Sequence, residues 1–325
     1  LMPSLSKARN MARATQCGAN MRTLVTAMAM YTTEYGKYPP SYIYPNSVEK
    51  DANNRVYKYN YDLADQPEDH PYGYIHWSHF LLGDSKVTDK AFECPAMTGG
   101  GAPRTNPGPV KTDWETGQAD QNGQTSPNDL TDAQASRMAY TANAAIVPRN
   151  KFTFQLAGAG AQRINHLVSP TTIDQPSATI LLTEFLDNWR GLTDGGKAEL
   201  VKSHRPVSAF HGLGAGIDEY KVEASNNYFY YTVAGNIENY ALKNYNELLS
   251  SNTSVIDSGE TELNAVGRHH PGGDEEMGGT TNFVYGDGHV ERKTVLETVE
   301  NFEWGTHYYS LSGDNAVMDH PQNKI

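Results

Sequence analysis

The chain has 325 residues, with 26 Lys or Arg against 38 Asp or Glu, and a formal net charge of -12. A chain this long buries most of its unfolded surface without needing metals or disulfides. Basic side chains cluster only near the beginning, so the electrostatic footprint of a nucleic-acid-binding protein is missing. Many Gly, Pro, Asn, Thr and Tyr residues predict long loops rather than a helix bundle.

The first element is a predicted long helix from Ser4 to about Tyr35, a stretch without Pro and with a single Gly. Apolar or aromatic residues recur there every three or four positions, which is typical of one buried helix face. The residues of that face are Cys17, Met21, Leu24, Met28, Tyr31 and Tyr35. Gly36, Pro39 and Pro40 end the helix. At roughly 50 Å the helix is longer than a small domain needs, so we expect its first turns to protrude.

Two cysteines, Cys17 and Cys94, are present. This number excludes a disulfide-dense scaffold and a zinc site with four thiolates. A bridge between the two in an oxidising compartment and a pair of buried free thiols are both compatible with the sequence.

Further along the chain, apolar and polar stretches alternate. "YGYIHWSHFLLGD" (72–84) predicts a short helix, with Trp77, Phe80 and Leu81 facing inward, and "AFECPAM" (91–97) predicts a strand. "SATILLTEF" (177–185) has the composition of a buried strand. The Gly-, Pro- and Asn-rich stretches are predicted to form exposed loops. They cover residues 98–131 and 192–258.

The clearest local signal after the first helix is "TNFVYGDGHVERKTV", residues 281–295. Two runs of apolar and β-branched residues flank Asp287-Gly288, a pair that tolerates the positive φ angles of a type I′ turn. We therefore expect a β-hairpin with its two-residue turn at these positions.

Several histidines are candidate ligands with simpler alternatives. His76 and His79 are three residues apart in the predicted helix and could share a metal, although an interface pair beside Trp77 explains them as well. His204 and His211 are best interpreted as loop histidines. The catalytic motifs G-x-S-x-G, Walker A, G-x-G-x-x-G and H-E-x-x-H are missing from the chain.

Acidic and aromatic residues suggest two ligand classes. The segment "RHHPGGDEEMGG" could hold calcium through its carboxylates, although it lacks the spacing of an EF-hand. The calcium candidates are Asp274, Glu275, Glu276, Asp314 and Asp319. The 20 Tyr and four Trp could form a stacking surface for glycans. Glu184, at the end of a predicted strand, could act with His269 or His289 as a general acid or base, but a structural role is more common.

The beginning of the chain resembles the pilin-like proteins of the type II secretion and type IV pilus class. The matching residues are Leu1, Pro3, Leu5, Lys7, Ala8, Arg9, Cys17, Asn20, Tyr31, Gly36, Pro39 and Pro40. Further matches are "FECP", "SATILLTE", "NFVYGDGHVE" and "WGTHYYSLSGDN". The resemblance covers about 100 residues, mainly at the two ends.

The segment "DGHVE" is similar to the H-x9-DG region found at the carboxyl end of that group. The corresponding residues are His269, His270, Asp287, Gly288 and His289. The spacing departs from the pattern, because Met277 stands where the family has His and both candidate histidines lie further back. We therefore expect no fixed geometry between the histidines and Asp287.

The resemblance implies an α+β pilin-like fold, with a helix over residues 1–36 and a head over 37–325. It also implies a structural rather than catalytic role, as a pseudopilin-like or minor-pilin-like subunit outside the cytoplasm. The residues expected on the assembly helix are Leu5, Cys17, Met21, Leu24, Met28 and Tyr31. An upstream leader and apolar helix would anchor the subunit in the inner membrane, and the absence of an initiator Met before Leu1 fits a chain cut after that helix. The alternative is a surface module that presents a glycan- or calcium-binding domain on the same anchor.

Overall fold

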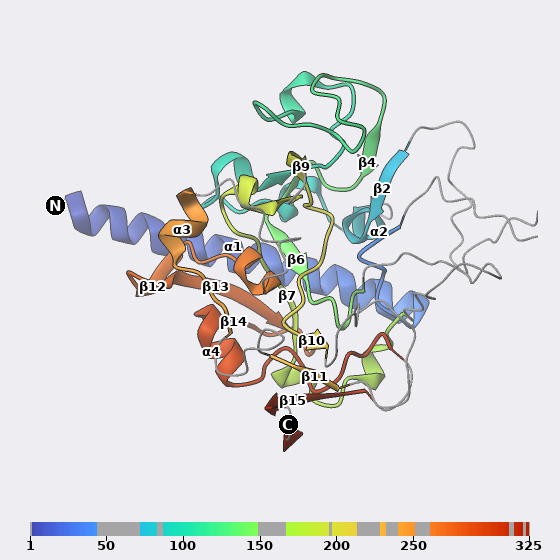
Figure 1. Ribbon diagram of the computed structural model, residues 1–325, viewed down its shortest axis with the longest axis vertical. Helices are drawn as coiled ribbons and strands as arrows, with labels where there is room; N and C mark the ends of the chain where they lie inside the picture. The colour runs from blue at the N-terminus through green and yellow to red at the C-terminus, as the bar shows by residue number, and fades with distance from the viewer. Residues whose placement is uncertain are drawn as a thin grey trace, which may run out of the picture.

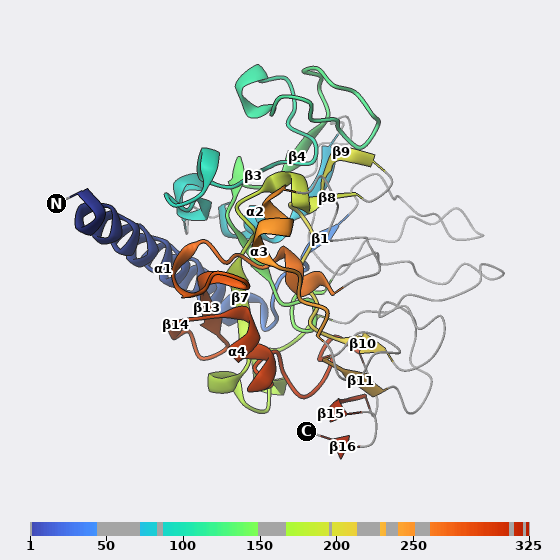
Figure 2. The ribbon, with the colours of Figure 1, turned by 60° about the vertical axis from the view of Figure 1, so that its left-hand side comes forward.

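The computed structural model has a long N-terminal helix laid on an antiparallel sheet (Figures 1 and 2). The predicted α+β class with an N-terminal helix is confirmed at this level. The residues described are 2–43, 72–82, 87–148, 167–194, 197–212, 228–231, 240–250, 261–311, 315–320 and 323–324.

Helix α1 (Met2–Tyr35) has the predicted extent. Gly36 ends it with a φ of +72°, a conformation that glycine adopts without steric cost. The buried face begins at Ala14, whereas residues 4–13 are exposed. Figure 1 shows this exposed end projecting beyond the other elements. We call residues 4–13 the projecting segment.

The predicted face of α1 faces the interior of the protein. Its buried members are Cys17, Met21, Leu24, Met28 and Tyr31. Tyr35 is 52% exposed, so its assignment to the buried face was wrong; its ring packs on Tyr31 at 4.5 Å between centroids. Among the residues expected to mediate assembly, Leu5 is the one left accessible, at 63% exposure.

The sheet under α1 has five strands in the order β12-β13-β7-β6, with β14 also paired to β13. All its pairings are antiparallel. The strands are β6 (Tyr140–Ala142), β7 (Ile180–Glu184), β12 (His270–Asp274), β13 (Gly278–Tyr285) and β14 (Val290–Lys293). α1 packs against β12, β13 and β14. The buried strand predicted over 177–185 is confirmed, since all five residues of β7 are buried.

The predicted β-hairpin is confirmed as β13 and β14, but its turn differs from the prediction. The amide of Gly288 donates to the carbonyl of Tyr285 (2.9 Å), and the amide of Tyr285 donates to the carbonyl of His289 (3.0 Å). Gly288 has a φ of +90°, whereas Asp287 does not have a positive φ. A type I′ turn needs positive φ at both central residues, so that assignment was wrong.

The stretch predicted as a helix over 72–84 divides into strand β2 (Tyr72–His76) and helix α2 (Trp77–Leu82). β2 lies between β1 (Tyr42–Ile43), which is antiparallel to it, and β4 (Thr131–Ala133), which is parallel. Pairing with a strand on each side satisfies the backbone of β2, and this tertiary contact overrides the local helical pattern.

The strand predicted at "AFECPAM" was also wrong. A 3-10 helix, Asp89–Phe92, is followed by a tight loop in which the amide of Cys94 donates to the carbonyl of Gly100 (2.9 Å). Phe92 and Cys94 are fully buried. Of the inward residues predicted in α2, Trp77 and Leu81 are buried, and Phe80 is half-buried against the core.

The stretch 98–131 is irregular, as predicted, but is not exposed throughout. Thr105 and Asn106 are fully buried. Asp132 accepts hydrogen bonds from the amides of Asn106 (2.9 Å) and Tyr74 (2.7 Å), which tie this segment to β2. The second predicted loop, 192–258, lies partly outside the described residues.

The other elements are short. The strands are β3 (Ala102–Pro103), β5 (Arg137–Met138), β8 (Thr193–Asp194), β9 (Lys197–Val201), β10 (His211–Gly212), β11 (Tyr228–Tyr230), β15 (Ala316–His320) and β16 (Asn323–Lys324). The α-helices are α3 (Tyr245–Ser250) and α4 (Val295–Glu300). The further 3-10 helices are Thr98–Gly100, Lys111–Asp113, Pro170–Thr172, Pro176–Ala178, Trp189–Leu192 and Glu262–Ala265. No helix within the described residues is both long and apolar enough to cross a lipid bilayer.

A disulfide joins Cys17 of α1 to Cys94, across 77 residues of sequence. Of the two alternatives that the sequence left open, the structure therefore has the bridge. A hydrogen bond from Asn20 Nδ2 to the carbonyl of Glu93 (2.7 Å) joins the same two segments. Next to the bridge, Gly18 lies against β13, where a Cβ atom would be 3.3 Å from Asn282 Oδ1.

The disulfide is expected to contribute about 4 kcal/mol to the free energy of unfolding, because it closes a long loop in the unfolded chain. Equilibrium unfolding in urea of the native protein and of the Cys17→Ser/Cys94→Ser variant measures this difference. Two free thiols per chain in a titration under denaturing, non-reducing conditions would contradict the bridge in protein from an oxidising compartment.

Candidate functional site

A buried ionisable cluster lies at the end of β7, where Glu184 is fully enclosed. Its Oε1 is 2.9 Å from Nε2 of His270. Its Oε2 accepts from the hydroxyl of Thr281 (2.7 Å) and from the amide (2.8 Å) and side chain (3.3 Å) of Asn282. A buried carboxylate is stable only when donors replace its lost hydration, and here β12 and β13 supply them.

The cluster keeps Glu184 ionised. Burial by itself would raise the pKa of Glu184, but the hydrogen bond from His270, the nearby imidazoles and the amide of Asn282 outweigh it and lower the pKa to about 2. Burial lowers the pKa of His269, which favours the neutral imidazole. Both oxygens of Glu184 accept hydrogen bonds from side chains or the backbone of β12 and β13, so the carboxylate joins these two strands to β7.

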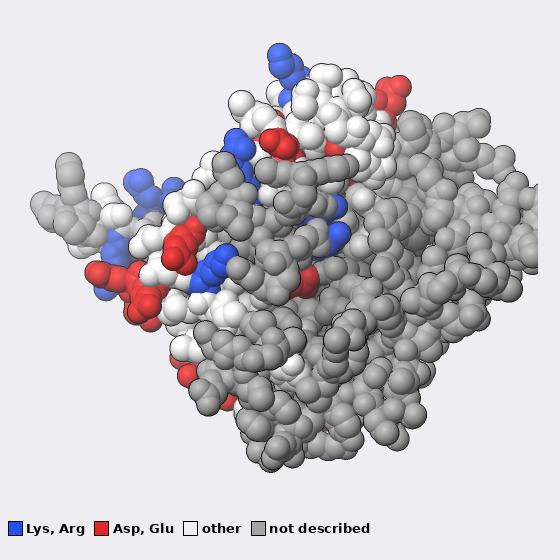
Figure 3. Space-filling view, in the orientation of Figure 1, with Lys and Arg blue, Asp and Glu red and all other residues white. Residues whose placement is uncertain are grey.

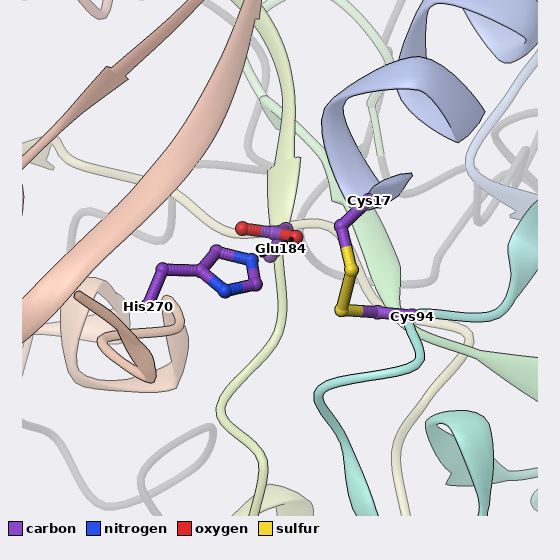
Figure 4. A group of neighbouring side chains, drawn as sticks. All are labelled: Cys17, Cys94, Glu184 and His270. Carbon is purple, nitrogen blue, oxygen red and sulfur yellow. Dashed lines mark hydrogen bonds and ion pairs between the residues drawn. A yellow bond between two sulfur atoms is a disulfide. The ribbon is translucent and has the colours of Figure 1, made fainter. Parts of the chain in front are cut away.

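The disulfide lies beside this cluster (Figure 4). The potential metal-ligand atoms of Cys17, Cys94, Glu184 and His270 lie within 4.8 Å of one another. No other group of three or more potential ligands is this close in the described ranges. The two sulfurs are bonded to each other, so they cannot bind a metal as thiolates. His269 Nε2 lies 3.8 Å from the sulfur of Cys94. In the disulfide form these residues therefore connect α1, β7 and β12 by packing and hydrogen bonds, and they do not form a metal centre.

A cavity of about 720 Å³ opens beside the cluster, between the projecting segment and the beginning of β12. The helix side is formed by Ser6, Lys7, Asn10 and Arg13. The opposite side is formed by Ala96, Asp187, Tyr245, Arg268, His269, His270, Pro271 and Gly279. In Figure 3, basic side chains follow the projecting end of α1, and acidic side chains gather near the end of β12. A volume of this size suits a small ligand.

The predicted family-motif residues divide between the two ends of β13. His270 pairs with Thr280 at the beginning of β13, whereas Asp287 lies in the turn after its end. His289 Nδ1 is 2.6 Å from Oδ1 of Asp287, and the His289 ring stacks on Tyr285. The expectation of no fixed geometry between the early histidines and Asp287 agrees with this separation. Glu184, by contrast, contacts His270 and not His289.

Three of the five calcium candidates, Asp274, Glu275 and Glu276, lie at the exposed connection between β12 and β13. The Oδ1 atom of Asp274 accepts from the amides of Glu276 (2.8 Å) and Met277 (2.6 Å), which explains an acidic residue there without an ion. Asp314 and the side chain of Asp319 lie outside the described residues. A calcium site and a glycan surface stay predictions; Trp77 and Trp304 are buried and offer no stacking face.

The remaining histidine candidates have structural surroundings. His76 is buried with Nδ1 2.9 Å from the hydroxyl of Ser78, and burial lowers its pKa to about 3. His79 does not belong to any cluster of potential metal ligands in the described part of the chain. His204 Nδ1 lies 2.7 Å from the hydroxyl of Thr105, and the side chain of His211 lies outside the described residues.

Sequence reasoning identified Glu184 but missed the partners that define its role. Thr281 and Asn282 were assigned only to a strand, and Arg268 and Tyr245 were given no role. The available signal was an acidic residue ending an apolar strand, since such a charge needs donors from its neighbours. Which neighbours supply them depends on strand pairing that the sequence does not reveal.

Comparisons with known proteins add no assignment: no protein-family model, no curated protein and no solved structure matches the chain.

Replacing Glu184 with Gln should reduce the pH dependence of stability. The folded-state pKa of about 2 lies below the usual 4.5, so the ionised carboxylate stabilises the fold above about pH 4.5 and loses this effect as the pH falls. Between about pH 5 and about pH 2, the native protein should lose about 3 kcal/mol more than Glu184→Gln in urea unfolding. Glu300→Gln removes an exposed carboxylate as a control. Parallel stability curves for the native protein and Glu184→Gln would contradict this role.

Proposed function

We propose that the chain is a structural subunit of a pilin-like assembly of the type II secretion or type IV pilus class. The observation that carries this proposal is the asymmetry of α1. Its later turns are built into the core, whereas the projecting segment continues the same helix into solvent. In this role the projecting segment packs against neighbouring subunits and the head displays its loops.

A helical segment that packs against nothing is only marginally stable in water. Isolated helices shorter than about 12 to 15 residues are marginal in water, and most helix stability in proteins comes from packing. The projecting segment leaves Leu5 (63% exposed) and Met11 (38% exposed) without cover. Helices of neighbouring subunits would supply that cover, and the later turns of α1 hold the segment in position.

The join between helix and head also suits a subunit of an assembly. The disulfide and the buried face of α1 fix the helix to the head. A disulfide is typical of oxidising compartments, which fits the proposed location outside the cytoplasm. In this proposal the helix continues upstream as an apolar segment in the inner membrane. The role is structural, and the complete burial of Glu184 among hydrogen bonds that join strands supports that choice over catalysis.

Site-specific photo-crosslinking in cells that express the full gene tests this proposal. A photoreactive amino acid at Ala8, on the exposed projecting segment, should give a ladder of covalent multimers of the chain. The same residue at Val110, which is 51% exposed on a loop of the head, is the matched control and should give mainly monomer. Identical patterns from the two positions, or only monomer from both, would contradict assembly through α1.

A further inference from the structure

The cavity beside α1 has a positive local charge on an acidic protein. Lys7, Arg13 and Arg268 line it, and Asp187 is the one carboxylate among the described residues of the lining. The formal charge of these lining residues is therefore +2, counting histidines as neutral, and the ionised Glu184 behind His270 reduces it to +1, whereas the whole chain carries -12. Concave surfaces with one sign of charge concentrate ligands of the opposite sign.

Arg268 is the most unusual member of this lining because it is buried and forms no salt bridge with a carboxylate among the described residues, although the charge of Asp274 acts on it. It is 1% exposed. Its two terminal nitrogens donate to neutral oxygens, namely the carbonyls of Lys243 (2.7 Å) and Met277 (3.3 Å) and the side-chain oxygen of Asn264 (3.1 Å). Its Nε has no hydrogen-bond partner among the residues that the structure describes. Burial lowers its pKa to about 10, so the side chain remains a cation at neutral pH.

The two histidines of the lining also carry unused nitrogens. Nδ1 of His269 and Nδ1 of His270 are buried and have no hydrogen-bond partner within the described ranges. Together with Nε of Arg268, three unsatisfied nitrogens belong to residues that line one cavity. Nε of Arg268 always carries a hydrogen, whereas Nδ1 of His270 is an acceptor when Nε2 of the neutral ring donates to Glu184. Buried donors in native proteins almost always have partners, so the unpaired Nε of Arg268 is the atom of this group that points to a missing acceptor.

Lys7 and Arg13 supply the accessible charges. Both are exposed, and neither forms a salt bridge with any carboxylate in the described part of the chain. They lie six residues apart on α1, and both face the cavity. Asp187 opposes them, but its Oδ1 already accepts from the hydroxyl of Tyr245 (3.1 Å).

We propose that this cavity is a binding site for a small oxyanion, a carboxylate or phosphate group carried by a solute that fits within about 720 Å³. Lys7 and Arg13 contact the anion directly, and buried Arg268 adds a fixed positive charge behind it. Charge-assisted hydrogen bonds of this type are the strong ones in proteins. Lys7 and Arg13 belong to the projecting segment that the proposed function assigns to assembly, but anion binding by the single chain does not require that assembly. A carboxylate side chain of a second copy would offer the same chemistry.

Isothermal titration at constant ionic strength tests the site, with sodium phosphate and sodium glucuronate as probes and neutral glucose as the comparison. The native protein should bind at least one of the two anions with a dissociation constant below about 10 mM and should not bind glucose. In the variant Lys7→Gln/Arg13→Gln, affinity should fall about tenfold or more. The melting temperature shows that this surface variant is folded.

The matched control is Arg9→Gln/Arg22→Gln, which removes the same charge from exposed positions of α1 that do not line the cavity. Its affinity should stay within about twofold of the native value, because screened charges outside the site contribute little. Equal loss in both variants, binding of glucose as tight as glucuronate, or no binding of either anion would overturn the proposal. Sedimentation velocity that shows self-association reversed by phosphate would overturn it in favour of a second copy.

Discussion

The structure depends on one constraint, the burial of the negative charge of Glu184. A carboxylate without water has to find donors, and in this protein they come from β12 and β13, the strands that follow it in the sheet. The need to supply hydrogen-bond donors to Glu184 also fixes the register of the neighbouring strands. Strand pairing must place Thr281 and Asn282 beside one oxygen and His270 beside the other, so an incorrect register would leave a charge unpaired. Specificity of the central sheet follows from this cost.

The same network reaches the helix. Asn282 donates to Glu184 and, through the same Nδ2, to the carbonyl of Ala14 at 3.2 Å. Gly18 allows α1 to approach β13 closely at the next turn, and the disulfide lies beside it. Sheet, helix and bridge are therefore joined around a single buried charge. The cavity opens where this packing ends and α1 continues alone, which explains why unpaired cations collect there.

Elements with a regular local pattern could be predicted from the sequence. Contacts between strands that are distant in the sequence could not. α1, β7 and the β13–β14 hairpin are long and regular enough for local patterns to define them. β2 looked helical because the partners that make it a strand lie on distant segments. The turn at Asp287 was misassigned because dipeptide preference does not distinguish a two-residue turn from a longer one. At the site, Glu184 was visible as a charge in an apolar stretch, but Arg268 had no sequence signal.

The position of the disulfide on α1 has a mechanical consequence. The last exposed residue before the buried face is Arg13, and Cys17 follows one turn later. A force applied to the projecting segment along the helix axis therefore acts on the disulfide within about one helical turn of the point where α1 meets the head. Tension would pass through the bridge to Cys94 and the segment around it, instead of peeling the helix from the sheet one turn at a time. Force applied to the helix is thereby transmitted to the head through a covalent bond as well as through packing.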